Sequence, residues 1–257
     1  ERIVRLACDY ADDYDFKKNP SLIEEAFQKT INQSIEDYMN DPFTDKSGLF
    51  ASPEGLDSLR TIASEKLMLT CPRLRYASIS HKQKKYYTES PILEANKAYE
   101  KAELMFVHRD FKGAIKEYNK AIKSDPSFVM AHDKLSLCYL YNQDYKKAAQ
   151  ASVKSLEIFK EGFKALLNAG DAYYGLQNAG ESNKYYSILT QLYPEEAEGY
   201  FGLAKVAAAT SDWEVAFNNA SKAHGIFQKK GNPMFRESQS LLDYIAREKT
   251  ANPLVRD

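Results

Sequence analysis

Small and apolar side chains recur every 34 residues between Ala95 and Lys230, in four copies that begin at Ala95, Val129, Phe163 and Ala197. Two columns of this repeat hold only small residues. The eighth column reads Ala102, Ser136, Gly170 and Ala204, and the twentieth reads Ala114, Ala148, Ser182 and Ala216. Two helices need small side chains where their backbones approach closely. A fixed period of this length therefore predicts a stack of helical hairpins.

The sixteenth and seventeenth columns mark the start of the second helix in each hairpin. The sixteenth holds Asp110, Asp144, Asn178 and Asp212, and the seventeenth holds Phe111, Tyr145, Ala179 and Trp213. Asp and Asn side chains accept hydrogen bonds from the unpaired N–H groups of a first helical turn. We therefore expect the sixteenth residue to cap each second helix and the following aromatic residue to pack into the hairpin. Pro126 and Pro194 then end the first and third copies.

Residues 1–89 lack these columns and read as a small helical bundle followed by a linker. Apolar residues at three- and four-residue spacing predict a helix over residues 3–14 and a second from Pro20 to about Met39. A loop over residues 41–52 precedes a third helix, which starts at Pro53 and is ended by Pro72.

Residues 73–90 show no clear period, and we interpret them as a solvated linker. Their basic cluster consists of His81, Lys82, Lys84 and Lys85 and is followed by Tyr86 and Tyr87. A nucleic-acid surface is the alternative, but it would need more positive charge and support elsewhere in the chain.

A last amphipathic helix follows the repeats. Asn232 and Pro233 form a helix start, and the apolar face consists of Met234, Leu241, Leu242 and Ile245. A stack of hairpins leaves its final apolar surface bare, so we expect residues 231–250 to form a capping helix and residues 251–257 a tail.

The columns of residues 95–230 resemble four tetratricopeptide repeats. Matches to that family's pattern are Leu135 and Leu203 at position 7, Tyr139 and Tyr173 at 11, Tyr118 and Tyr186 at 24, and Ala121 and Ala223 at 27. Departures are Lys101 at position 7, Ser152 and Ala220 at 24, and Lys160 and Gln228 at 32. The resemblance implies an all-α fold, an α-solenoid of four such hairpins over residues 90–230, with the bundle before it and the capping helix after it.

Composition is that of an ordinary globular protein. The 257 residues are 44% hydrophobic and 28% charged, with a net charge of −1, so we expect no general attraction to nucleic acid or to an anionic membrane. No apolar run approaches the roughly 18 residues that span a bilayer. The first residue is Glu1 and not Met, and we expect that a segment has been removed before it.

Catalytic motifs are missing from the sequence. The histidines are His81, His108, His132 and His224, and none has a Cys, Asp or Glu at the spacing of a zinc site. Walker, GxGxxG, GxSxG and HExxH motifs do not occur. We therefore predict a protein that is not an enzyme and has no catalytic residues, cofactor or metal site.

The resemblance also implies a binding surface. In tetratricopeptide repeats the concave wall is formed by positions 2, 5, 9, 12 and 13 of each first helix. We call the main residues at these positions the inner strip: Tyr99, Glu103, Phe106, Asp133, Leu137, Leu140, Tyr141, Lys164, Leu167, Asp171, Tyr174, Phe201 and Lys205. Aromatic and aliphatic side chains edged by both charges suit an extended peptide or an amphipathic helix.

A clamp for a C-terminal carboxylate, as in the chaperone-binding members of that family, does not fit this strip. The corresponding positions hold Tyr99, Glu103, Lys134, Lys164 and Asn168. Only Lys164 agrees with the pattern of that clamp. An apolar ligand therefore fits better than a chaperone tail.

Two functions follow from the strip. The first is a non-catalytic scaffold that binds a protein or peptide partner in the groove. The second is a structural or assembly component whose groove is filled by its own N-terminal region, for which Tyr86 and Tyr87 lie close enough in sequence, or which associates with itself as a homo-oligomer. An open groove predicts a contiguous exposed apolar patch, and a filled groove does not.

The cysteines leave the cellular compartment open. Cys138 lies inside a first helix, where we expect a buried thiol. Cys8 and Cys71 bracket the N-terminal region, as in secreted bacterial tetratricopeptide proteins, and the resemblance implies a possible disulfide and an extracytoplasmic protein, periplasmic or secreted. The alternative is a cytoplasmic protein with two ordinary buried cysteines, because disulfides are rare in that compartment.

Overall fold

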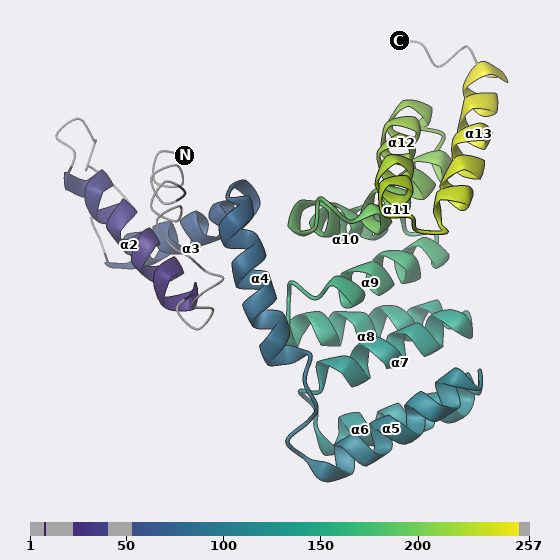
Figure 1. Cartoon of the computed structure of the whole chain (residues 1–257), viewed down its shortest axis with the longest axis horizontal. Coiled ribbons are helices and arrows are strands. Elements are labelled where there is room, and N and C mark those ends of the chain that lie inside the picture. Colours follow the sequence, from purple (N-terminus) through teal and green to yellow (C-terminus); the bar gives the residue numbers. More distant parts are fainter. Residues whose placement is uncertain (1–7, 9–22, 41–52, 252–257) are drawn as a thin grey trace. The chain divides into compact units, whose positions relative to one another are not determined.

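The computed structural model describes residues 8, 23–40 and 53–251 and is all-helical over them (Figure 1). Its helices are α2 (Ile23–Asn40), α3 (Pro53–Thr70), α4 (Pro72–Tyr86), α5 (Leu93–Val107), α6 (Phe111–Ser124), α7 (Val129–Tyr141), α8 (Tyr145–Ile158), α9 (Phe163–Gly175), α10 (Ala179–Leu192), α11 (Ala197–Ala209), α12 (Trp213–Lys229) and α13 (Phe235–Ala251). The chain divides into two compact units, residues 1–85 and 86–257. The all-α fold expected from the repeat pattern is confirmed.

The N-terminal unit has a small apolar core between α2 and α3. Ile31 and Ile35 of α2 are buried together with Ala63 and Leu67 of α3. These residues lie on the faces that the three- and four-residue spacing predicts. The helix expected over residues 3–14 lies outside the described residues, apart from Cys8.

A disulfide bond closes this unit. It joins Cys8 to Cys71, which lies between α3 and α4, with 5.7 Å between the two Cα atoms. The bond encloses a loop with a sequence separation of 63 residues, and closing a loop of that length in the unfolded chain stabilises a fold by about 4 kcal/mol in the chain-entropy model.

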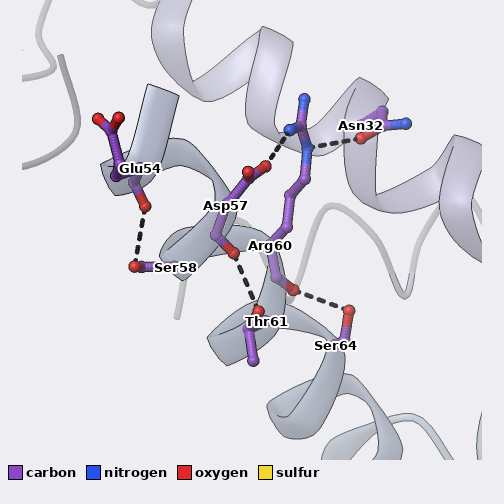
Figure 2. Close-up of polar contacts among 7 residues, drawn as sticks. All are labelled: Asn32, Glu54, Asp57, Ser58, Arg60, Thr61 and Ser64. Carbon is purple, nitrogen blue, oxygen red and sulfur yellow. Dashed lines mark hydrogen bonds and ion pairs between the residues drawn. The ribbon is translucent and has the colours of Figure 1, made fainter. Parts of the chain in front are cut away.

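The polar face of α3 is satisfied largely within the helix (Figure 2). The hydroxyls of Ser58, Thr61 and Ser64 donate to carbonyls one turn earlier, at 2.7 to 3.0 Å. Arg60 makes the polar link to α2, because its Nε donates to Asn32 Oδ1 at 3.1 Å while its Nη1 pairs with Asp57 at 2.7 Å. Exposed pairs of this kind contribute at most about 1 kcal/mol.

The linker expected over residues 73–90 is wrong for most of its length, because residues 72–86 form α4. Pro72 ends one helix and also begins the next, since proline suits the first helical position, where its missing N–H would be unpaired anyway. The basic cluster then falls near the end of α4, with Lys84 and Lys85 in its last turn. Cations at that end interact favourably with the helix dipole, which gives Lys84 and Lys85 a structural role.

The second unit consists of four hairpins whose bounds keep the 34-residue period. The helices α7, α9 and α11 begin at Val129, Phe163 and Ala197, and α6, α8, α10 and α12 begin at the seventeenth residue of each copy. The helix α5 begins two residues early, at Leu93. All eight small residues of the two columns are buried. Where a serine replaces alanine it bonds across the hairpin: Ser136 Oγ donates to the Ala148 carbonyl and Ser182 Oγ to the Gly170 carbonyl, both at 2.9 Å.

The turn inside each hairpin is the same four times. The sixteenth residue donates its backbone N–H to the carbonyl of the eleventh at 2.9 Å, and the fifteenth donates to the twelfth, which is the Schellman closure of a helix. The fifteenth residues adopt left-handed φ angles of 57° to 61°: Arg109, Gln143, Gln177 and Ser211. The side chain of the sixteenth residue accepts from the N–H three residues later, at 2.9 to 3.3 Å. The capping roles expected of Asp110, Asp144, Asn178 and Asp212 are confirmed.

The helix α13 packs against the last hairpin. Ile245 is fully buried in a cluster with alanines of α11 and α12, and Leu241 and Leu242 lie against it. His224 Nδ1 of α12 lies 3.0 Å from Ser238 Oγ of α13. Apolar side chains that the stack would otherwise expose are therefore covered by α13.

We predict that Gly202→Ala destabilises the second unit by about 1 to 3 kcal/mol. The fully buried ring of Tyr186 lies against both Gly170 and Gly202, and a Cβ at either glycine would overlap it. Urea unfolding measures the change. Gly225→Ala is the matched control, because nothing lies within 4 Å of a Cβ there, and alanine should stabilise the interior of α12 by up to about 1 kcal/mol. Equal effects of the two substitutions would contradict the packing described for Tyr186.

Candidate functional site

The inner strip runs along α5, α7, α9 and α11 of the second unit, and its members differ in exposure. Asp133 is buried, Tyr99 and Phe201 are half-buried, and Tyr141 and Tyr174 are 56% and 37% exposed. Tyr99 packs on Phe128 with ring centroids 5.0 Å apart. The aromatic residues at position 5 therefore contribute to the core, whereas Tyr174 at position 12 and Tyr141 at position 13 offer surface to a ligand.

Part of the strip is covered by the chain itself. The hydroxyl of Tyr87 donates to Asp133 Oδ2 at 2.5 Å, and the ring of Tyr87 meets Phe159 edge-on at 6.0 Å. Lys164 Nζ lies 5.5 Å from the centre of the Tyr87 ring. Tyr86 stacks on Phe159 at 5.1 Å. The strip residues Asp133 and Lys164 are thus occupied from within.

The residues that follow Tyr87 are fastened to the first repeat. Ser90 Oγ donates to Asp125 Oδ2 at 2.5 Å. The side chain of Asn96 is bonded to both backbone groups of Ser90, at 2.6 and 2.8 Å. We call residues 86–92, the start of the second unit, the strap, because they contact its repeats at Asp125, Asp133 and Phe159.

Asp133 is a buried residue whose carboxyl accepts two hydrogen bonds and whose backbone carbonyl accepts a third. Besides Tyr87, Ser155 Oγ donates to its Oδ1 at 2.6 Å, and Asn168 donates to its backbone carbonyl at 3.0 Å. Burial raises the pKa of Asp133 to about 6, against the opposing effects of the two hydroxyl donors and of the Lys164 charge. Burial, together with the neighbouring Asp133 carboxyl, raises the pKa of the Tyr87 phenol, which therefore stays a donor.

Charged and aromatic side chains form one cluster twice along the strip. In the first cluster Glu103 accepts from Tyr118 and pairs with Lys134 at 2.8 Å, and Lys134 lies 4.8 Å from the centre of the Phe106 ring. In the second cluster Asp171 accepts from the Tyr186 hydroxyl at 2.7 Å and pairs with Lys205 at 3.2 Å; Lys205 lies 5.2 Å from the Tyr174 ring.

The second cluster lies two repeats after the first, with its acidic residue and its tyrosine at the same positions. Tyr118 and Tyr186 stand at position 24 of repeats one and three, where repeats two and four have Ser152 and Ala220. The sequence shows these tyrosines but not that they bond to the acidic residues of the inner strip. A buried hydroxyl requires a hydrogen-bond partner. An acidic residue at position 9 of the same repeat is the feature of the sequence that could have predicted this bond.

The described residues offer no metal-binding group. No group of three His, Cys, Asp or Glu side chains there could hold a metal ion. Nor is any described helix long and apolar enough to cross a bilayer. His132 is buried, its Nε2 lies 3.0 Å from the carbonyl of Pro126, and burial lowers its pKa. Its role is therefore structural.

Comparison with known families and structures agrees with this architecture. A family model described as tetratricopeptide repeat matches residues 93–159 and 167–222. A search of curated proteins finds no match.

Among solved structures, residues 41 to the end of MamA from Desulfovibrio magneticus RS-1 are 17% identical, with a TM-score of 0.50, over 68% of this chain and 91% of that one. The apo form of RapI is 14% identical, with a TM-score of 0.54, over 98% of this chain and 73% of that one. YrrB, described as a TPR protein with an unusual peptide-binding site, is 16% identical, with a TM-score of 0.46, over 69% and 95%. At such identities the first two show a shared fold alone.

We predict that Asp133→Asn changes how stability depends on pH. A carboxyl whose pKa rises from an unfolded value near 4 to about 6 on folding favours the native state below pH 4, and this contribution is lost as the pH rises through 6. The wild type should therefore lose up to about 3 kcal/mol relative to the variant between pH 4 and 7. Urea unfolding of both proteins across this range measures the difference. A difference that stays constant with pH would contradict the raised pKa.

Proposed function

Because the chain is a tetratricopeptide-repeat protein, with the repeats at residues 93–159 and 167–222, and so a scaffold for protein interaction, we propose that it binds a peptide along part of its inner strip. The part in question comprises positions 9 to 13, which lie towards the C-terminal end of each first helix from the contacts of Tyr87 with Asp133 and Lys164. Its exposed members include Tyr141 and Tyr174, and Lys205 is partly exposed. We propose further that the chain acts without catalysis and without a cofactor.

The observation that carries this proposal is the exposure of aromatic side chains beside half-exposed charges. Tyr141 is 56% exposed and Tyr174 is 37% exposed. A stack of repeats could bury such rings, so their exposure is consistent with a binding role. Tyrosine offers a rigid apolar ring and a polar tip, which makes it frequent where proteins meet. The ion pairs at Glu103 and Asp171 supply both donors and acceptors at the edges of the strip.

The alternative is a structural component that the strap closes. The contact of Tyr87 with Asp133 favours it, because this contact occupies the strip at its second repeat. In that case the strip binds no peptide while the strap is in place. Substituting Tyr87 by Ala should then uncover a binding activity that the wild type lacks.

We predict that Tyr141→Ala with Tyr174→Ala weakens binding at least tenfold for peptides selected on the wild-type protein from a random display library. Both side chains are exposed, so the variant should keep its helical circular dichroism. Tyr76→Ala is the control, since this tyrosine is 77% exposed and lies on α4, outside the strip. Selected peptides that bind the double variant as tightly as the wild type would refute the proposed surface.

We propose that the protein resides outside the cytoplasm, where its disulfide would persist. Protein from its native source, denatured without reductant, should show one reactive thiol per chain, that of the buried Cys138. Reduction should raise the count to three, by releasing Cys8 and Cys71. Three thiols before reduction, in samples quenched with acid at collection, would argue for the cytoplasm instead.

A further inference from the structure

An aromatic ring closes the junction that follows the hairpin turn in three of the four repeats. In the first repeat Phe111, at position 17, stacks on Tyr141 of the next repeat with centroids 4.7 Å apart and an interplanar angle of 11°. Phe106 meets Phe111 edge-on at 5.6 Å. Three rings therefore fill the junction between repeats one and two.

The second and fourth repeats are closed in the same way. The ring of Tyr145 lies so close to Gly175 that a Cβ there would overlap it. Trp213 meets Tyr244 of α13 edge-on, with centroids 6.1 Å apart. Position 17 thus carries a ring that packs on the following element each time.

The third repeat has Ala179 at position 17, and a pocket of about 500 Å³ lies there. It is lined by Tyr174, Gly175, Gln177, Ala179, Val206, Ala209 and Thr210. At the positions equivalent to Phe106, Phe111 and Tyr141 of the first junction, this junction has Tyr174, Ala179 and Ala209. Two of three rings are absent, and the pocket occupies the space that they would fill.

The pocket adjoins the inner strip and not the strap. Tyr174 belongs to both pocket and strip, and Lys205 of the strip lies 5.2 Å from its ring. The strap reaches α9 at Lys164, ten residues before Tyr174, which is about 15 Å along a helix. The contacts of Tyr87 therefore leave this pocket uncovered.

We propose that this pocket accepts one aromatic side chain of a peptide that lies along the inner strip, so that the partner supplies the ring that the third repeat lacks. The inference rests on the proposed function and deepens it. A pocket with mainly apolar walls and a few polar groups, here Gln177 and Thr210, is the usual setting of an anchoring side chain. The matching ring sites in repeats one and two show that this geometry holds a flat ring.

The test uses N-acetyl-phenylalanine amide and N-acetyl-tryptophan amide as probes, with methyl NMR of Ala179, Val206 and Ala209. We expect saturable shifts in these methyl groups, with a Kd on the order of 1 mM for ligands of this size, and none with N-acetyl-alanine amide. Ala179→Phe restores the ring of the other repeats and should weaken probe binding at least tenfold, with an unchanged or higher unfolding temperature.

A second variant and a control accompany this substitution. Ala209→Tyr fills the pocket from the opposite wall, as Tyr141 does in repeat two, and should have the same effect. Gly180→Ala changes the neighbouring residue, where a Cβ would meet nothing closer than 3.7 Å, and should leave probe binding unchanged.

Two outcomes would overturn the inference: no saturable shift in the wild type, or shifts that both filling variants leave unchanged. Display-selected peptides distinguish it from the proposed function. If they bind the wild type and both filling variants equally, the strip binds peptides and the pocket takes no part. If the amides bind in the pocket but no peptide is captured, the aromatic site stands and the peptide scaffold fails.

Discussion

The solenoid depends on one residue per repeat that closes one helix and opens the next. At position 16 the backbone N–H completes the Schellman closure of the first helix, and the side chain caps the second. Because the residue before it is left-handed in all four copies, the two helices leave the turn in the same relative direction each time. This direction brings the small residues of positions 8 and 20 together, and the stacking of the hairpins follows.

The sequence could predict what is local or periodic. The 34-residue columns predict the hairpins, and the Asp or Asn at position 16 of each repeat predicts where the second helix begins. The sequence does not predict α4, because Pro72 can either end a helix or occupy the first turn of the next one, and here it does both. The contacts within the site could not be predicted because their partners are distant in sequence. Tyr87 and Asp133 are 46 residues apart, and Glu103 and Lys134 are 31 residues apart. No local pattern marks such pairs, since they arise only when the repeats stack.

The strip is divided along the length of its helices. Near the start of α7 and α9, the strap occupies Asp133 and Lys164. Near the ends of the same helices, Tyr141 and Tyr174 face solvent. One surface thus combines an internally satisfied region, which orders the entry of the chain into the repeats, with an open region that carries aromatic side chains. Repeats one and two carry a charged cluster that matches the one in repeats three and four. The two pairs differ in the junction, which is filled by rings in the first pair and holds a pocket in the second.

The helix α13 has a mechanical consequence. A linear array of repeats ordinarily frays from its ends, where each terminal repeat has a single neighbour. Here α13 covers the last hairpin, and the bonds of Ser90 to Asp125 hold the start of the first. Between the two secured ends, the junction of repeats three and four differs from the others, because the rings that close those junctions are missing there. Because the pocket there is lined by residues of both repeats, a molecule bound in it would link the first three repeats to the fourth as one continuous stack.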